Sequence, residues 1–405
     1  MAKHAVLSSA AKMWKSLACA KSELRLDLTL ACGQSFRWRE TAEGHWTGVL
    51  GGRVWTLTQT DDTLWYHVYK NQERQVEVRD GKRRRTSAAV QITDKAERRF
   101  KGVLEKEEEE RPAETSVQDV KEEEETLRDY FQLNVKLQDL YKEWGAADPH
   151  FKNIADTFTG VRLLRQDPTE CLFSFICTSN NHISRIQGMV ERLCQALGTP
   201  LCQLDQTSYH NFPSLFALAD GSVEESLRDL GFGYRARFLQ QSARRIVDTH
   251  GLEWLNNLRS VPYLQARDAL RSLPGVGTKV ADCVCLMSLD KTDAVPIDTH
   301  VWQIAKRDYK YAAGNGQKTI TDKLHREIGD FFRKLWGPCA GWAQSVLFCA
   351  DLKRFQNLKE MPNVKRSQEE EDCEKELIVA CKKPKIKKEE KDTRSARHRK
   401  AEMSI

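Results

Sequence analysis

The first part of the chain alternates between apolar and polar positions with a period of two. Between residues 24 and 78, short runs rich in aromatic and β-branched residues are separated by glycine or by aspartate-rich turns. Such alternation is typical of strands with one buried face. We therefore expect an antiparallel sheet domain over residues 24–79, with strands at 36–38, 46–50, 54–58 and 64–68.

From residue 127 to residue 355 the apolar spacing becomes helical. Phe151, Ile154, Ala155 and Phe158 form one stripe, and similar stripes recur along the segment. Glycine and proline interrupt the pattern often enough to separate eight or more helices. The fold class is therefore α+β, with the sheet domain followed by a helical domain over residues 127–355.

Two segments have neither period and are rich in charge. Residues 80–126 hold blocks of arginine and glutamate, and bury too little apolar surface to offset the entropy of ordering. We expect a disordered insertion or a loose helix there. Residues 356–405 read as a disordered basic tail. Its lysine- and arginine-rich runs at 382–388 and 397–400 suit either a nuclear localisation signal or non-specific DNA binding.

The first 23 residues carry four lysines and no acid before Glu23. This composition is compatible with a mitochondrial transit peptide. The alternative, which we favour, is a frayed start whose later part, from Trp14 onward, belongs to the fold. We accordingly expect a nuclear protein, with mitochondrial targeting as a second possibility.

Bulk composition excludes several classes. Apolar residues make up 40% of the chain, and no run is long enough to span a membrane, so no membrane partner is expected. The net charge of +6 is too small to establish nucleic-acid binding alone. Twelve cysteines occur without a C-x-x-C pair, which indicates reduced thiols and no metal site.

The most informative stretch runs from residue 268 to residue 300. A helical pattern ends at Pro274 and Gly275, and a new one begins at Gly277 and Thr278. A Leu-Pro-Gly-Val-Gly turn between two helices resembles the helix-hairpin-helix motif. The backbone N–H groups of Gly275 and Gly277 would lie near a positive helix end, where they suit a DNA phosphate.

Two side chains add possible chemistry to this motif. Lys279 lies in the first turn of the second helix, where the helix dipole and burial both disfavour an ammonium and so favour a nucleophilic amine. Asp298 stands before the next apolar stripe, as an N-cap would. Taken singly, such a lysine is usually solvated and such an aspartate is usually only a cap. Their occurrence together in one short span favours catalysis.

The same span resembles the helix-hairpin-helix DNA glycosylases with the Gly-Pro-Asp signature. The resemblance is strongest to the eukaryotic 8-oxoguanine DNA glycosylase/AP lyase family and covers most of residues 13–355. It is carried by CGQSFRW at 32–38, YFQLNV at 130–135, ECLFSFICTSNNHISRI at 170–186, GFGYRAR at 231–237 and GPCAGWAQSVLF at 337–348. It implies a TATA-binding-protein-like sheet before a two-lobed helical domain. The long insertion at 80–126 departs from the family.

The resemblance also implies a bifunctional enzyme that excises 8-oxoguanine opposite cytosine. Lys279 would form a Schiff base with the sugar and Asp298 would assist it, followed by β-elimination. The extruded base would lie between Cys283 and Phe348, with Gln344 on its Watson–Crick edge and Pro296 lining the site. Gly33 would offer its backbone carbonyl to the N7–H that 8-oxoguanine has and guanine lacks. No cofactor is implied.

The implied partner is double-stranded DNA with 8-oxoguanine opposite cytosine, bound by a monomer. Arg185 and Arg235 would read the orphaned cytosine, because an arginine fork suits its two acceptors. Taken alone, each arginine suits a phosphate contact or surface charge equally well. The remaining implied DNA contacts are Asn180 in the gap left by the base, Tyr234 as a wedge beside it, the turn glycines Gly275 and Gly277, and His300 and Gln317 on the backbone.

Two other interpretations stay open. A related glycosylase for oxidised pyrimidines would commonly carry a four-cysteine iron–sulfur site after the aspartate, and the spacing of Cys339 and Cys349 does not fit one. An adenine-mispair enzyme would not need Lys279. A non-enzymatic hairpin module would bind damaged and undamaged duplex alike and release no base.

Overall fold

The computed structural model describes residues 2–7, 13–70, 117–312 and 319–360. The chain divides into two units, Met1–Gln356 and Asn357–Ile405. All helices and strands of the described residues lie in the first unit, except that the short helix α16 (Gln356–Glu360) crosses the boundary. Residues 361–405 of the basic tail, residues 80–116 of the charged insertion and residues 71–79 of the expected sheet domain lie outside the described residues.

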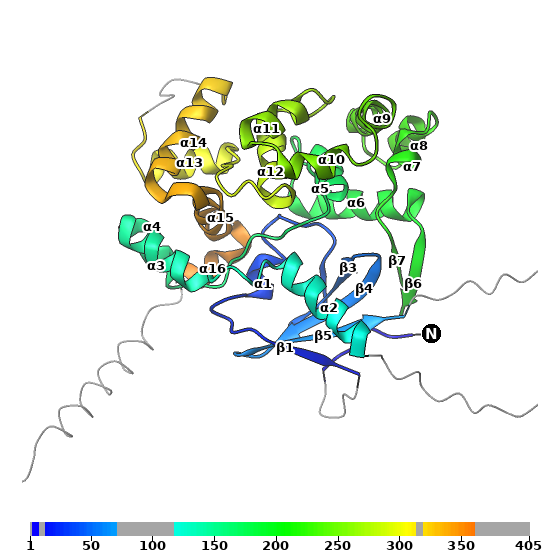
Figure 1. The fold of residues 1–405 in the computed structure, drawn as a ribbon, viewed down its shortest axis with the longest axis horizontal. Coiled ribbons are helices and arrows are strands. Elements are labelled where there is room, and N and C mark those ends of the chain that lie inside the picture. Colours follow the sequence, from blue (N-terminus) through cyan, green and yellow to red (C-terminus); the bar gives the residue numbers. More distant parts are fainter. Residues whose placement is uncertain (1, 8–12, 71–116, 313–318, 361–405) are drawn as a thin grey trace, which may run out of the picture. The chain divides into compact units, whose positions relative to one another are not determined.

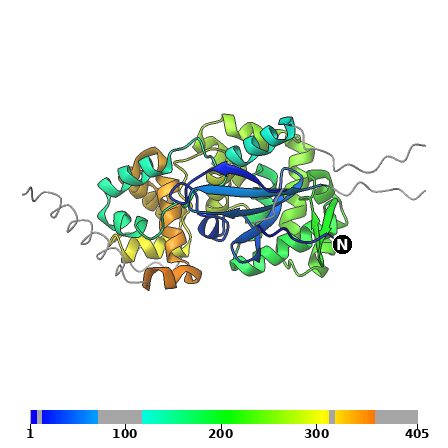
Figure 2. The same ribbon diagram turned by 90° about the horizontal axis from the view of Figure 1, so that it is seen from below.

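A five-stranded antiparallel sheet forms the N-terminal part, as the alternating pattern predicted. Its strand order is β1-β5-β4-β3-β2. Figure 1 shows the strands on one side of the unit and helices α9, α11 and α12 on the other, and Figure 2 shows the sheet from below, in front of the helices. The strands are β1 (Lys15–Ala18), β2 (Arg39–Ala42), β3 (His45–Leu50), β4 (Arg53–Gln59) and β5 (Thr63–Tyr69).

Two details of the sheet differ from the expectation. The segment 36–38 is not a strand; β2 begins only at Arg39. Trp38 instead buries its indole against Gly48 of β3, where an added Cβ would lie 2.6 Å from the ring, and donates from Nε1 to Tyr130 Oη at 2.9 Å. A tertiary contact of the aromatic ring thus overrides the strand propensity of this run.

The sheet also starts earlier than residue 24. Strand β1 pairs with β5, with Lys15 opposite Tyr66 and Ala18 opposite Thr63. The interpretation that the chain from Trp14 onward belongs to the fold is therefore confirmed. Residues 2–7 are ordered as well, since Ala2 forms a parallel bridge to Leu204.

Part of the expected disordered insertion is a packed helix. Helix α2 (Val117–Tyr130) begins ten residues before the expected boundary at 126/127. Its acidic block does not face water alone: Glu123 is buried and pairs with Lys15 of β1, and Glu122 pairs with Arg53 of β4. The expectation of disorder was wrong here because the charge pattern gave no sign of basic partners more than 60 residues away.

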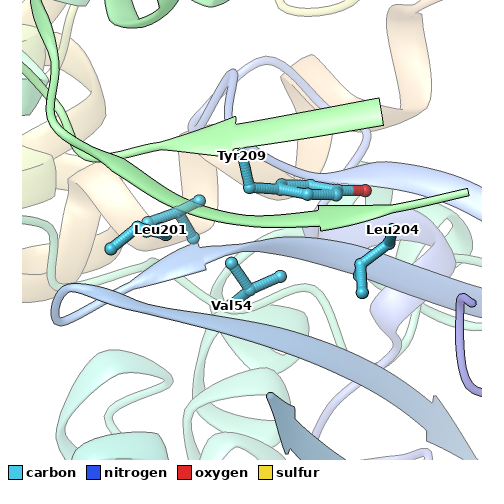
Figure 3. Packing of buried hydrophobic residues seen from close by; sticks show 5 residues of the cluster. Val54, Leu201, Leu204 and Tyr209 are labelled. Atoms are coloured by element: carbon cyan, nitrogen blue, oxygen red, sulfur yellow. The ribbon is translucent and has the colours of Figure 1, made fainter. Parts of the chain in front are cut away.

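A second correction concerns residues 200–210, which we expected to be helical. They form a hairpin of β6 (Pro200–Leu204) and β7 (Thr207–His210). Leu201, Leu204 and Tyr209 bury their side chains against Val54 of the main sheet (Figure 3). The hairpin exists because its apolar face fits this sheet, which local spacing did not reveal.

The rest of the first unit is helical, which confirms the α+β class. Among the described residues, no helix has the length and apolarity needed to cross a membrane. The helices are α1 (Leu26–Thr29), α3 (Leu137–Ala147), α4 (Pro149–Ala155), α5 (Pro168–Ile176), α6 (Ile183–Leu197), α7 (Leu215–Ala219), α8 (Val223–Asp229), α9 (Arg235–Arg245), α10 (Trp254–Asn257), α11 (Tyr263–Arg271), α12 (Thr278–Ser288), α13 (Thr299–Arg307), α14 (Asp322–Trp336) and α15 (Ala340–Asp351), with single turns at Ile246–His250, Leu258–Ser260, Gly337–Cys339 and Lys353–Phe355.

Candidate active site

The predicted hairpin is formed by α11, the turn at 272–277 and α12. Gly275 has φ +77°, and an added Cβ would lie 2.6 Å from the ring of Phe238, so no other residue fits this position. Gly277 is the N-cap of α12 and supplies no side-chain cap. The first N–H groups of α12 therefore have no capping side chain, and both glycines line a surface groove.

Asp298 is the N-cap of α13, as the sequence predicted. Its Oδ1 accepts a hydrogen bond from the backbone N–H of Val301 at 3.0 Å. Val301 and Ile304 are buried, so the helix is held on its apolar side and directed by the cap at its start. The carboxylate is nevertheless only half-buried and faces a cavity.

That cavity is the central feature of the site. It has a volume of about 430 Å³, part of it open to solvent, and is lined by the loop after α1, by α5, α12 and α15, and by the start of α13 with the segment before it. All seven residues predicted as catalytic or base-binding line it: Gly33, Lys279, Cys283, Pro296, Asp298, Gln344 and Phe348. Lys279 and Asp298, which are 19 positions apart in the sequence, thus line the same cavity.

The cavity walls are mostly apolar. Cys283 comes from α12 and Phe348 from α15, so the two come from different helices. Burial raises the pKa of Cys283 to about 11, although the Lys279 ammonium acts to lower it. The thiol is therefore neutral at physiological pH and behaves as a small apolar group.

Gln344 contributes a polar side chain to the cavity wall from α15, next to Ser345. Gln344 is 4% exposed, and within the described part of the chain its amide has no hydrogen-bond partner. Its amide atoms are not among the fully buried unpartnered polar atoms of the described residues, so the amide remains accessible from the cavity with free hydrogen-bonding groups. This position therefore points to a polar ligand edge inside the cavity.

Lys279 reaches the cavity from the first turn of α12. Its Nζ lies 5.1 Å from the centroid of the Phe175 ring and 3.5 Å from Thr178 Oγ1. Both partners come from α5 and the loop that follows it. The aromatic face and the hydroxyl hold the amine at the cavity wall without a carboxylate partner among the described residues.

The loop that carries Gly33 is fixed from behind. Gly33 has φ +83°, and an added Cβ would lie 3.0 Å from Ile183 Cδ1, so only glycine is unstrained here. The buried Gln34 donates to the Arg162 carbonyl at 2.7 Å and accepts from the N–H of Leu164 at 3.0 Å. These bonds tie the sheet domain to the helical domain beside the cavity.

A groove of about 2620 Å³ adjoins the cavity and shares Gly33, Lys279, Asp298 and Phe348 with it. Four of the predicted DNA contacts line this groove: Asn180, Gly275, Gly277 and His300. His300 also lies beside Asp351, with 3.3 Å between Nδ1 and Oδ2. The structure therefore places the hairpin and the cavity mouth along one surface.

The other predicted DNA contacts have mixed positions. Asn180 is exposed and has φ +47°. The side chains of Tyr234 and Arg235 both donate to the carbonyl of Ser179, the residue before Asn180. Arg235 is 4% exposed, so it is neither a surface charge nor a free phosphate contact here; it supports the loop. Arg185 is exposed and lines neither the groove nor the cavity. Gln317 lies outside the described residues.

Comparison with known proteins agrees with this geometry. A family model described as 8-oxoguanine DNA glycosylase, N-terminal domain, matches residues 16–172, and one described as HhH-GPD superfamily base excision DNA repair protein matches residues 173–329. The N-glycosylase/DNA lyase OGG1 of Arabidopsis thaliana is 36% identical over 349 residues, 85% of this chain and 82% of that protein. The chain belongs to the 8-oxoguanine DNA glycosylase family of the HhH-GPD superfamily.

Other relatives of this family agree. The N-glycosylase/DNA lyase of Saccharomyces cerevisiae is 39% identical over 250 residues, covering 56% of this chain and 66% of that protein. Among solved structures, MBOgg1 in complex with a low affinity DNA ligand superposes with a TM-score of 0.64 at 26% identity, covering 84% of this chain and 95% of that one. The Clostridium acetobutylicum 8-oxoguanine glycosylase/lyase, in complex with dsDNA containing cytosine opposite 8-oxoG, gives 0.62 at 25%, covering 83% and 93%.

Several residues of this glycosylase-family site escaped the sequence analysis. Neither Phe175 nor Thr178 was predicted as a site residue, yet these two contact Lys279. Their one signal was position, because both lie in the stretch 170–186 that carries the family resemblance. Further cavity residues that were not predicted are Cys32, Gln34, Met287, Val301 and Ser345.

Proposed function

We propose that this chain is a bifunctional DNA repair enzyme that excises 8-oxoguanine paired with cytosine and then cuts the strand at the resulting site. The observation that carries the proposal is the shared cavity of Lys279 and Asp298, which opens to the groove lined by the hairpin glycines. A glycosylase needs such an enclosed space because it must take the base out of the duplex to reach the sugar.

In the proposed reaction, the neutral amine of Lys279 attacks C1′ of the sugar. The C1′–N9 bond breaks, its electron pair leaves with the base, and the base is protonated. The sugar ring then opens to a Schiff base between C1′ and Nζ. Loss of a C2′ proton and cleavage of the C3′–O bond complete a β-elimination, which nicks the strand 3′ to the lesion.

Asp298 is the proposed electrostatic partner of this step. Its fixed carboxylate would stabilise positive charge on the sugar, help to deprotonate the amine, or do both. Because Oδ1 is engaged with the N–H of Val301, the carboxylate is oriented before DNA binds. Preorganised charge of this kind needs no rearrangement during the reaction.

The base pocket provides the proposed recognition. Cys283 and Phe348 would stack on the two faces of the purine, and Gln344 would hydrogen-bond its Watson–Crick edge. The carbonyl of Gly33 would accept from N7–H of 8-oxoguanine and repel the N7 lone pair of guanine. One hydrogen bond and one avoided repulsion amount to roughly 10²- to 10⁵-fold selectivity.

On the opposite strand, Asn180 would occupy the gap, Tyr234 would wedge beside it, and Arg185 and Arg235 would donate to cytosine O2 and N3. Within the described residues Nη1 of Arg235 has no protein partner, so it is available as a donor. We further propose that the protein acts as a monomer in the nucleus, with mitochondrial targeting as the alternative.

The test is chromatographic detection of free base after incubation with a duplex carrying 8-oxoguanine opposite cytosine. We expect release of 8-oxoguanine and none of guanine from a matched undamaged duplex. Release of an oxidised pyrimidine from the corresponding duplex, without release of 8-oxoguanine, would instead support the related glycosylase. Equal binding of both duplexes without any base release would support a non-enzymatic hairpin module.

A further inference from the structure

Helix α14 contacts both arms of the hairpin through one carboxylate. Asp322, its first residue, accepts a hydrogen bond from Thr278 Oγ1 at 2.6 Å through Oδ1. Its Oδ2 accepts from Arg271 Nη2 at 2.7 Å. Arg271 ends α11 and Thr278 begins α12, so the Asp322 bridge joins the two ends of the turn. The hydrogen bond from Thr278 holds the pKa of Asp322 below its usual range, which keeps the carboxylate ionised.

A second bridge lies one helical turn deeper. His325 Nε2 is 2.7 Å from Asp282 Oδ2, and the Tyr263 hydroxyl donates to Asp282 Oδ1 at 2.8 Å. The side chains of His325 and Asp282 are 6% and 1% exposed. The His325 bridge thus also joins α14 to α12 and, through Tyr263, to α11. A carboxylate buried this deeply requires such partners.

The two bridges have matching spacing. Asp322 and His325 are three residues apart on α14, while Thr278 and Asp282 are four apart on α12, so each pair lies on one helix face. Lys279 is located between the two anchored positions of α12. Lys279 itself contacts Thr178. Among the described residues, the other side-chain hydrogen bonds of residues 278–282 are those of the two bridges.

The first turn of α12 needs the two bridges for a physical reason. Gly277 gives α12 no side-chain cap, so the turn is not held from its own N-terminus. A lysine side chain is long and flexible, and its amine reaches a fixed point only if the backbone that carries it is fixed. Asp322 and His325 also line the groove, beside Gly277 and Thr278, where the duplex would lie.

We propose that Asp322 and His325 are positioning residues that hold the first turn of α12 so that the Lys279 amine is aimed at C1′. The inference deepens the proposed function and rests on it. Both residues act through Thr278 and Asp282 and need not touch the substrate. Their loss slows formation of the covalent intermediate while affinity for the duplex is largely kept.

The experiment measures borohydride trapping in single turnover, at saturating protein, on a duplex with a preformed abasic site. His325→Ala should slow trapping on the order of 10- to 100-fold, the cost of a misplaced reacting group. His325→Gln should recover most of the rate, because its amide can place a donor near the position of Nε2. Thr278→Val, which removes one hydrogen bond of the more exposed bridge, should slow trapping without unfolding the protein.

The matched control is Lys323→Gln, on the same helix but with its side chain 81% exposed and outside both bridges. It should trap at the wild-type rate. Folded His325→Ala and Thr278→Val proteins that also trap at that rate would overturn the proposal, as would a folded His325→Gln protein as slow as the alanine variant. Absence of trapping in the wild-type protein would instead overturn the proposed function. Duplex affinity and melting temperature are measured for each variant to separate slow trapping from weak binding or unfolding.

Discussion

The carboxylate of Asp298 accepts a hydrogen bond from the backbone N–H of Val301 at 3.0 Å, and the same residue lines the cavity that contains Lys279. One side chain therefore caps α13 and faces the proposed reaction centre. The two roles can be separated by substitution, because capping needs an oxygen whereas stabilising a cationic sugar needs a charge.

Asp298→Asn should retain the cap and lose the charge. We expect the free energy of unfolding to fall by well under 1 kcal/mol, since asparagine caps helices about as well as aspartate. Base release should fall by orders of magnitude with little change in duplex affinity. The measurements are urea unfolding, single-turnover base release and fluorescence anisotropy. Asp298→Ala, which loses both roles, should cost about 1 kcal/mol in stability as well. An asparagine variant whose activity merely follows its folded fraction would show that Asp298 is only a cap.

Lys279→Gln should abolish covalent trapping. Glutamine is close to lysine in length but has no nucleophilic amine, so neither the Schiff base nor β-elimination can proceed. The measurement is a denaturing gel of protein and duplex after borohydride treatment. Lys306→Gln, which changes a lysine stacked on Trp302 of α13, serves as the control and should trap normally. Trapping that persists in the Lys279 variant would require a different nucleophile.

Alanine should be tolerated at one turn glycine and not at the other. At Gly275, φ is +77° and the new Cβ would lie 2.6 Å from the Phe238 ring; at Gly277, nothing lies within 4 Å. Gly275→Ala should therefore lower the free energy of unfolding by roughly 2–5 kcal/mol, from backbone strain and overpacking together. Gly277→Ala should change it little. Urea unfolding of the two variants decides this, and equal losses would contradict the geometry.

Glu170 should make stability depend on pH. It lies in α5 beside Arg37, with 3.7 Å between Oε2 and Nε, and burial raises its pKa from 4.5 to about 7. The folded state therefore keeps a proton that the unfolded state releases, so this group's contribution to stability is lost as pH rises from 4.5 to 7. The loss is at most about 3 kcal/mol.

Glu170→Gln removes this titration. The stability of the variant relative to the wild type should therefore increase between pH 5 and pH 8, as measured by urea unfolding at both values. A difference that does not change with pH would show that Glu170 ionises normally in the folded protein.

Much of the site could be predicted because its signals are local. The turn at Gly275, the N-cap at Asp298 and the pairs Lys279–Cys283 and Gln344–Phe348 depend on spacings of a few residues, which the backbone converts directly into geometry. The family resemblance then supplied roles for these positions. The expected α+β class followed from two apolar periods in two parts of the chain.

What the sequence determined by itself was thus the type of most elements and the face on which their side chains lie, but not the hairpin at 200–210 or helix α2. The tertiary structure decided which faces meet. It placed Gly33 of the sheet domain in the same cavity as Lys279 and Asp298, which follow it by more than 200 residues. It also docked the acidic helix α2 on Lys15 and Arg53, and it buried Arg235 behind the loop that carries Asn180. Such contacts depend on complementary shape and charge between distant segments, and local periodicity carries no information about them.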